Sequence, residues 1–404
     1  MAPLTQAFHS DLSLAPNSYI YKILSTSPRT DPLSYFQTDA LAVISSDDSL
    51  HFINPATLKV LPDGVIKNVN ESVTCLERVD DPLSNVVATA GRDGMIRFWD
   101  KRNRNKVMLI QSPNKLISSL VCNNPRNFIA AGIENPDDGP GVSPVLIWDQ
   151  RNVQKPLLEL IESHTDTITD LQLHPNHPTL LLSSSTDGLV NIFDVSKPDE
   201  EEALYQVINH RSAVAHAGFM YPTTDIYTLG TDETMSFYAL QSHEEEEEPT
   251  PTIFGDMREK LDCEYMAKIH WVGDEAFIAA GKHSSSTLDL IPIQKAPQSP
   301  PLQYDYDLEM SLRLPDAHGG EIIRDVFTDV HSHTTYTVGE DGFIRAWKLP
   351  GDEGMDIDDE GALGTPKRIK DKDRKEKRMG KKEKRKGPGG NVAEGGRKAR
   401  YNPY

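Results

Sequence analysis

Residues 164–194 read HTDTITDLQLHPNHPTLLLSSSTDGLVNIFD. Three short apolar runs are separated by polar turns, and Asp187-Gly188 lies between two of them, which is a strong signal for a β-hairpin. The stretch has too little apolar surface to fold alone. It therefore predicts one repeat among several that pack on one another.

The pattern of this stretch recurs along the chain. A turn aspartate follows a hydroxyl residue by four positions and precedes a bulky residue by six. The matching sets are Thr89, Asp93 and Trp99; Ser183, Asp187 and Phe193; Thr228, Asp232 and Tyr238; Thr337, Asp341 and Trp347. A weaker set has Val43, Asp47 and Ile53. Neighbouring aspartates are about 45 residues apart, or about twice that, which predicts seven units with the period of propeller blades.

We therefore expect an all-β, seven-bladed β-propeller. The expected blades span about 36–62, 63–108, 109–156, 157–206, 207–240, 262–293 and 304–350. Residues 241–261, which contain Glu244–Glu248, read as a solvated loop between blades. Because nothing after Pro350 looks like a strand, the last blade lacks an outer strand. We expect residues 18–25 to supply it and close the ring within 18–350, after a flexible segment 1–17.

The charge divides the chain into two parts. The whole chain has 404 residues and a net charge of −19, but residues 365–404 contain 16 basic and 5 acidic side chains. Residues 1–364 therefore carry about −30. We expect residues 351–404 to form a disordered tail that is first acidic and then basic.

Composition disfavours several classes of protein. Cys75, Cys122 and Cys263 are odd in number and lack metal-ligand spacing, so a reducing compartment fits better than a disulfide framework. The N-terminus lacks the pattern of a secretion signal, and no run approaches 18 apolar residues, so we expect no membrane partner. No Gly-x-x-x-x-Gly-Lys loop occurs, and we expect no cofactor.

A histidine precedes three of the repeated sets, at His164, His210 and His318. We expect each histidine to hydrogen-bond the hydroxyl residue and the aspartate of its set, so that neighbouring strands are pinned together. A His–Ser–Asp set also resembles a nucleophilic triad. Its recurrence in three blades, and the lack of a Gly-x-Ser-x-Gly turn, favour architecture over catalysis. His331 and His333, with His174 and His177, lack supporting Cys or carboxylate spacing, so we expect no metal site.

The bulky residue, together with the histidine, hydroxyl and aspartate positions, makes a four-residue pattern that resembles a known repeat family. Phe98-Trp99-Asp100, Ile147-Trp148-Asp149 and residues 187–194 resemble WD repeats, whose tetrad is His, Ser or Thr, Asp and Trp. Within that family, the runs His164–Thr169, Ser184–Asp194 and Glu201–Leu204, with the expanded blade from Ala131-Gly132 to Trp148-Asp149, are similar to a subgroup that has fungal members. The resemblance implies a seven-bladed WD-repeat propeller that has no catalytic activity.

Two Trp-Asp-x-Arg runs occur in adjacent blades. They are Trp99-Asp100-Lys101-Arg102 and Trp148-Asp149-Gln150-Arg151. In WD-repeat proteins this pattern resembles the box by which substrate receptors dock the adaptor of cullin-4 ubiquitin ligases. The alternative is that each arginine forms only a surface ion pair or a turn contact.

The basic tail has two interpretations, a solvated tail without a partner or a nuclear import signal. We favour the signal, which predicts an import receptor as partner and location in the nucleus or nucleolus, with a cytoplasmic pool as the alternative. Its basic residues include Lys367, Arg368, Lys370, Lys381, Lys382, Lys384, Arg385 and Lys386. No aromatic residue lies among them, so any contact with nucleic acid would be non-specific.

The acidic ring predicts basic protein partners, such as histones or ribosomal proteins. The WD-repeat resemblance implies that the residue before each turn aspartate lines the binding face. Those residues are Arg92, Thr186, Thr231 and Glu340. We therefore expect a non-enzymatic scaffold for protein–protein interactions. The alternatives are a substrate receptor of a cullin-4 ligase, and a propeller hydrolase, for which no paired carboxylates or nucleophile set exist outside the structural tetrads.

Overall fold

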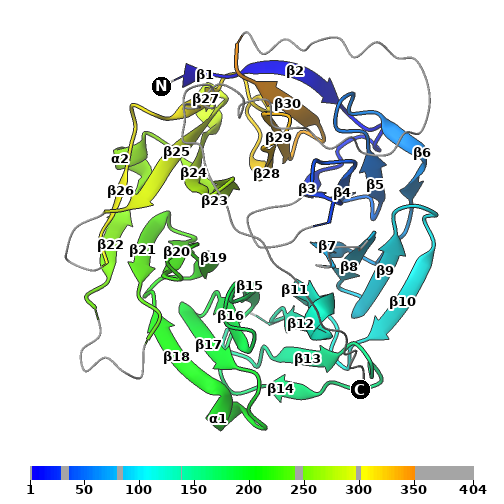
Figure 1. Ribbon diagram of the computed structural model, residues 1–404, viewed down its shortest axis with the longest axis vertical. Helices are drawn as coiled ribbons and strands as arrows, with labels where there is room; N and C mark the ends of the chain where they lie inside the picture. Colours follow the sequence, from blue (N-terminus) through cyan, green and yellow to red (C-terminus); the bar gives the residue numbers. More distant parts are fainter. Residues whose placement is uncertain are drawn as a thin grey trace, which may run out of the picture. The chain divides into compact units, whose positions relative to one another are not determined.

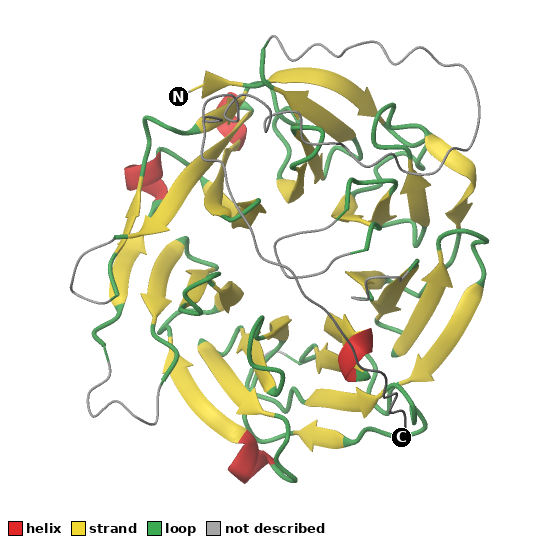
Figure 2. Ribbon diagram, in the orientation of Figure 1, coloured by secondary structure: helices red, strands yellow, loops and turns green. Residues whose placement is uncertain are grey.

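The computed structural model describes residues 2–28, 36–79, 85–137, 139–241, 249–296 and 302–350. In the described part of the chain, seven sheets are arranged around a common centre (Figure 1). In each sheet, three strands that follow one another along the chain run outward from the centre, with the first of the three innermost. All strand pairs of the described residues are antiparallel except one, in which residues 2–3 pair with residues 312–313. Almost all regular structure in the described part is strand (Figure 2). The expected seven-bladed β-propeller is confirmed.

The first four blades are simple four-stranded sheets. Blade 1 contains β3 (Ile20–Ser25), β4 (Leu41–Ser45), β5 (Leu50–Ile53) and β6 (Val60–Ile66). Blade 2 contains β7 (Val73–Arg78), β8 (Val86–Gly91), β9 (Met95–Asp100) and β10 (Lys106–Gln111). Blade 3 contains β11 (Ile117–Asn123), β12 (Phe128–Ile133), β13 (Val145–Asp149) and β14 (Leu158–Leu160). Blade 4 contains β15 (Ile168–Leu173), β16 (Leu180–Ser185), β17 (Leu189–Asp194) and β18 (Leu204–Asn209).

The last three blades are completed by distant or split strands. Blade 5 contains β19 (Val214–Phe219), β20 (Ile226–Gly230), β21 (Thr234–Tyr238) and β22 (Thr252–Asp256). Blade 6 contains β23 (Tyr265–Val272), β24 (Glu275–Lys282), β25 (Thr287–Lys295), β26 (Tyr304–Tyr306), β27 (Leu312–Leu314) and β1 (Ala2–Pro3). Blade 7 contains β28 (Ile323–Asp329), β29 (Thr334–Gly339), β30 (Ile344–Lys348) and β2 (Thr5–Ser10).

The few helices of the described residues are short. They are α1 (Glu200–Ala203), α2 (Arg258–Leu261) and the 3-10 turns Asn124–Arg126 and His283–Ser285. In the described part of the chain, no helix has the length and apolar character needed to cross a membrane.

A β-bulge interrupts the start of the innermost strand in each of the seven sheets. The register shifts between Ile20 and Lys22 in blade 1, and at the equivalent place in every other blade. A bulge adds one residue opposite the partner strand and changes the direction in which a side chain points. The extra residues are Tyr21, Thr74, Ser118, Thr169, Ala215, Ala267 and Arg324. They all lie at the same end of the ring's inner wall.

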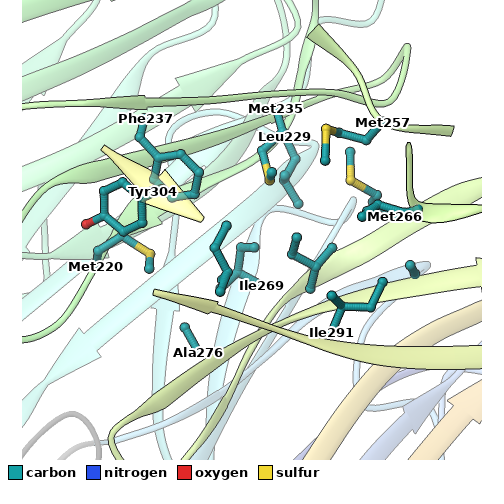
Figure 3. Close-up of a cluster of buried hydrophobic side chains, with 14 of the residues drawn as sticks. Met220, Leu229, Met235, Phe237, Met257, Met266, Ile269, Ala276, Ile291 and Tyr304 are labelled. Atoms are coloured by element: carbon teal, nitrogen blue, oxygen red, sulfur yellow. The ribbon is translucent and has the colours of Figure 1, made fainter. Parts of the chain in front are cut away.

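The hydrophobic core is divided among the interfaces between blades. Seven buried clusters each combine side chains from two neighbouring blades. The cluster between blades 5 and 6 is rich in methionine, with Met220, Met235, Met257 and Met266 (Figure 3). Flexible methionine fills irregular gaps, which suits an interface whose blade 6 departs most from the repeat pattern. Each blade is therefore stable only between its neighbours.

The strand that closes the ring differs from the expected one. β2 (Thr5–Ser10) pairs with β30 and is the outer strand of blade 7, while residues 20–25 form the innermost strand of blade 1. The prediction that an N-terminal strand closes the last blade is correct, but its location at 18–25 is wrong. Residues 1–17 are likewise not simply a flexible segment, because 2–3 and 5–10 are strands. Residues 20–25 take the inner position because their apolar side chains are buried there, whereas the side chains of residues 5–10 suit an exposed outer strand.

The expected boundaries of blades 1, 5, 6 and 7 also need correction. Blade 1 begins at Ile20, upstream of the expected 36–62. Residues 252–256, assigned to a loop, pair with β21 as the outer strand of blade 5. β26 and β27 both pair with β25, so 304–314 belong to blade 6 rather than blade 7. In the sequence, the long connections that precede these outer strands resemble the loops between blades. The expected disordered tail, 351–404, lies outside the described residues.

Candidate interaction faces

The histidines of blades 4 and 7 join the strands around them. His164 contacts Asp187 Oδ2 through Nδ1 (3.0 Å) and Ser183 Oγ through Nε2 (2.7 Å). In blade 7, the corresponding distances are 2.7 Å from His318 Nδ1 to Asp341 Oδ1 and 2.8 Å from Nε2 to Thr337 Oγ1. These are the hydrogen bonds expected from the sequence.

The aspartate of each set is held in its charged form. Burial alone would raise the pKa of Asp187, but the bond from His164 and those from the backbone N–H groups of Thr165 and Leu189 outweigh it, so the pKa lies below its usual value. Asp341 follows the same pattern, with His318 as the main partner that lowers its pKa. Burial also lowers the pKa of His318. These sets therefore act as fixed struts at neutral pH.

Blades 2 and 5 build the same strut from other residues. In blade 2, Asn70 occupies the place of the histidine, since Thr89 donates to Asn70 Oδ1 (2.8 Å) and Asn70 donates to Asp93 Oδ1 (3.0 Å). Trp99 Nε1 donates to Thr89 Oγ1 at 2.9 Å.

In blade 5, His210 contacts Thr228 Oγ1 (2.9 Å) and reaches Asp232 only through Thr234. Tyr238, at the bulky position, also interacts with Thr228. Asn70 and Thr234 were not identified from the sequence.

The bulky residue completes the strut only where an acceptor faces it. Trp347 Nε1 donates to Thr337 Oγ1 at 2.9 Å. Trp148 pairs with Ile129, so the acceptor position two residues further is Ala131. The buried indole N–H of Trp148 therefore finds no hydrogen-bond partner among the described residues. In blade 4, Phe193 has no N–H to donate, and Asn191 Nδ2 approaches His164 Nε2 instead (3.2 Å).

The residues before the turn aspartates lie at one rim of the ring. They are Arg92, Thr186, Thr231 and Glu340, next to the turns that join the second and third strands of blades 2, 4, 5 and 7. Arg92 and Thr231 are exposed, whereas Thr186 and Glu340 are partly exposed. We call this the aspartate-turn rim. It presents polar side chains supported directly by the buried struts.

The two Trp-Asp-x-Arg runs lie at the opposite rim. β9 and β13 lead away from the aspartate-turn rim and end at Asp100 and Asp149, so strands of six and five residues, roughly 17–20 Å long, separate the rims. Trp99 and Trp148 are buried, but the side chains of Arg102 and Arg151 are 67% and 73% exposed. The arginine is therefore the most exposed residue of each run, while Asp149 and Gln150 of the second run are partly exposed.

Each of these arginines binds the aspartate of its own run. Arg102 forms a bidentate pair with Asp100 (2.6 and 3.0 Å), and Arg151 does the same with Asp149 (2.5 and 2.9 Å). The hydrogen bonds from Arg151 lower the pKa of Asp149 to about 2. Asp256 and Arg258, at the end of β22, make the same pair without a preceding tryptophan. The pairing is thus a property of the Asp-x-Arg turn.

The described residues offer neither an accessible nucleophile in the His–Ser/Thr–Asp sets nor a cluster of metal ligands. The side chains of His164 and His318 are almost completely buried, and their Ser or Thr partners have no exposed surface. No group of three or more His, Cys, Asp or Glu side chains that could hold a metal comes together within the described ranges.

Comparison with known proteins agrees with this architecture. The WD40 model (WD domain, G-beta repeat) matches residues 65–100 and 154–194. Together with the seven blades and their His–Asp struts, the match identifies the ring as a seven-bladed WD-repeat β-propeller.

The relatives carry the same family name. The chain is 34% identical over 275 residues to a WD repeat-containing protein of Saccharomyces cerevisiae, covering 67% of this chain and 65% of the relative, which is less than two thirds of that protein. It is 22% identical over 301 residues to the WD repeat-containing protein 89 homolog of Dictyostelium discoideum (65% and 80%). A shorter match, 31% over 114 residues, is to DDB1- and CUL4-associated factor 13 of Gallus gallus (26% and 24%).

Proposed function

We propose that this chain is a non-catalytic scaffold that binds other proteins at the rims of its ring. The observation that supports this most directly is the burial of the His–Ser/Thr–Asp sets. His164 and Ser183 are bonded to each other beneath the surface, so they stiffen the ring and have no access to a substrate. A rigid ring that presents loop side chains at its rims suits protein recognition.

The charge of the chain supports basic partners. Residues 1–364 carry about −30, so positively charged proteins such as histones or ribosomal proteins would be attracted over long range. Thr186 and Thr231 belong to neighbouring blades on the aspartate-turn rim and lie away from its arginine. We propose that this part of the rim contacts a basic segment of the partner.

Affinity purification with mass spectrometry tests the scaffold. The tagged full chain is compared with the double variant Thr186→Arg, Thr231→Arg, which adds two positive charges to the rim. The matched control is Val207→Arg, on the outer strand of blade 4, where Val207 is 51% exposed. We expect the rim variant alone to lose basic partners. Equal recovery from all three proteins, or no specific partner from the full chain, would contradict the proposal.

We propose that the basic tail directs the chain to the nucleus, including the nucleolus. The support is the Lys/Arg cluster of residues 367–386, which has the composition of an import signal. A fluorescent fusion truncated after residue 364 should become cytoplasmic while the full-length fusion is nuclear. Nuclear retention of the truncated fusion would refute the role of the tail.

A second candidate function is that of a substrate receptor of a cullin-4 ligase. It is favoured by the exposure of Arg102 and Arg151 on one rim, and by the partial match to a relative that is named for association with DDB1 and CUL4. Co-precipitation of DDB1 should be lost in the double variant Arg102→Ala, Arg151→Ala. Arg258→Ala is the matched control, because Arg258 makes the same pair with Asp256 outside a Trp-Asp run. Undiminished co-precipitation by the double variant excludes this function.

A further inference from the structure

A cavity of about 490 Å³ opens where blades 7, 1 and 2 meet. Its lining residues are Tyr21, Ser46, Asp48, Ser72, Val73, Thr74, Arg92 and Arg324. All but Val73 have a polar or charged side chain, and two carry a guanidinium group. The cavity adjoins the aspartate-turn rim, because Arg92 belongs to both.

The repeat geometry of the ring explains why these side chains converge. Tyr21, Thr74 and Arg324 are the extra residues of the bulges in blades 1, 2 and 7. Ser46 and Arg92 immediately precede the turn aspartates of blades 1 and 2. The same two backbone positions in neighbouring blades therefore supply five of the lining residues. At these two positions, tyrosine occurs only in blade 1, as Tyr21, and arginine only in blades 2 and 7, as Arg92 and Arg324. The three side chains come together because the three blades are neighbours.

Both arginines are held in place on one side by a glutamate. Arg92 donates two hydrogen bonds to Glu134, one from Nε (2.9 Å) and one from Nη2. Arg324 donates one hydrogen bond to Glu340, from Nη2. The two guanidinium-bearing side chains are 50% and 49% exposed. Among the bonds formed between described residues, Nη1 of Arg92 and both Nε and Nη1 of Arg324 have no acceptor. Each arginine can thus donate to a ligand while its glutamate keeps it oriented.

The other lining groups are compatible with an anion. Asp48 carries the one carboxylate of the lining, and its oxygens already accept the backbone N–H groups of Val73 (2.7 Å) and Ser72 (3.2 Å). Burial raises the pKa of Tyr21. Its hydroxyl therefore stays protonated at neutral pH and can donate a hydrogen bond.

We propose that this cavity binds a phosphate group between Arg92 and Arg324, with the Tyr21 hydroxyl as a further donor. A phosphate presents several oxygens in different directions, so it can accept bonds from donors on three blades at once. A carboxylate offers two oxygens in one plane and would satisfy fewer of them. This inference goes beyond the proposed function, because a phosphate ester could bind whether or not a protein partner does.

The phosphate could belong to a small phosphate ester or to a phosphorylated side chain of a protein. Both present the same group to the arginines. A phosphoserine peptide, its unphosphorylated form and pyrophosphate separate the two sources. Tighter binding of the phosphopeptide than of pyrophosphate assigns the site to a phosphorylated protein, whereas equal or weaker binding assigns it to free esters.

The test uses the full chain and isothermal titration with pyrophosphate. Arg92→Gln and Arg324→Gln should each weaken binding about ten- to hundredfold, the effect of losing one charge-assisted hydrogen bond. Tyr21→Phe removes only a hydroxyl and should weaken binding by a smaller factor. Thermal unfolding of each variant is the control for folding, and we expect each melting temperature to stay close to that of the unaltered chain.

Arg258→Gln is the matched control, because Arg258 is also 50% exposed and paired with a carboxylate, but begins α2, which follows blade 5 and is not part of the cavity lining. Its affinity for pyrophosphate should equal that of the unaltered chain. Binding that is unchanged in all variants would place the anion on the basic tail and overturn the proposal. The absence of binding to the unaltered chain, or acetate binding as tightly as pyrophosphate, would overturn it as well.

Discussion

Two leucines beside β2 are expected to hold the ring closed. The side chains of β2 are almost all exposed, but Leu4, just before it, is 4% exposed and packs between blades 6 and 7. Leu12, just after it, is 5% exposed and packs between blades 7 and 1. Truncation of a buried leucine to alanine costs about 2–5 kcal/mol through lost apolar contact and the cavity left behind. We expect that cost for Leu4→Ala and for Leu12→Ala.

Urea unfolding of the full chain, followed by tryptophan fluorescence, measures this effect. Trp347 belongs to the same cluster as Leu4 and reports on the closing blade. Leu157→Ala makes the identical chemical change at a side chain that is 71% exposed, and should alter the free energy of unfolding by less than about 0.5 kcal/mol. The reasoning fails if Leu4→Ala and Leu12→Ala behave like this control, or if Leu157→Ala is equally destabilising.

Three further predictions concern the struts, a buried histidine and a turn glycine. Asp187→Ala should lower the free energy of unfolding by about 2–4 kcal/mol, because His164 and two backbone N–H groups lose their acceptor; lost partner binding at an unchanged melting temperature would contradict this. Burial lowers the pKa of His174 to about 4, so its unfolded form takes up a proton first and stability falls as the pH drops from about 6.5 to 4. His174→Asn should flatten that dependence by up to about 1.4 kcal/mol per pH unit in urea titrations, and an unaltered slope would exclude this histidine as the cause. Gly342→Ala should destabilise the ring more than Gly319→Ala in thermal unfolding, because both glycines have positive φ (75° and 58°) but only a Cβ at 342 would lie 2.5 Å from the carbonyl oxygen of Ser18; equal effects would show that the close contact is unimportant.

The sequence predicted the middle of each blade better than its edges. The second and third strands are joined by a turn with its own chemical signature, such as Asp187-Gly188, which can be read locally. The outer strand has no such signature. β2 (TQAFHS) faces solvent and pairs mainly through its backbone, so its amino acids carry little information about its place. The apolar residues 20–25 gave a stronger strand signal and were assigned to the wrong position.

The struts could be predicted from the sequence in part, and the cavity could not. The histidine, hydroxyl and aspartate positions in blades 4 and 7 follow from their constant spacing. Asn70 replaces a histidine from a position that the template did not include, and Thr234 acts as an intermediate between His210 and Asp232. The cavity depends on bulges in three separate sheets. The sequence has no signal for the bulges. It also does not show that Tyr21 and Arg324, which are 303 positions apart in the chain, lie close together.

The pairing of residues 2–10 with blades 6 and 7 also imposes an order on folding. These residues are synthesised first, yet Thr5 pairs with Lys348, 343 positions later in the chain. A contact of such long sequence separation forms slowly, because a long loop must close before any stabilising pairing is gained. Until then, β30 presents an unpaired edge that can associate with another chain. Ring closure is therefore the stage of biosynthesis at which this protein is most exposed to misassembly.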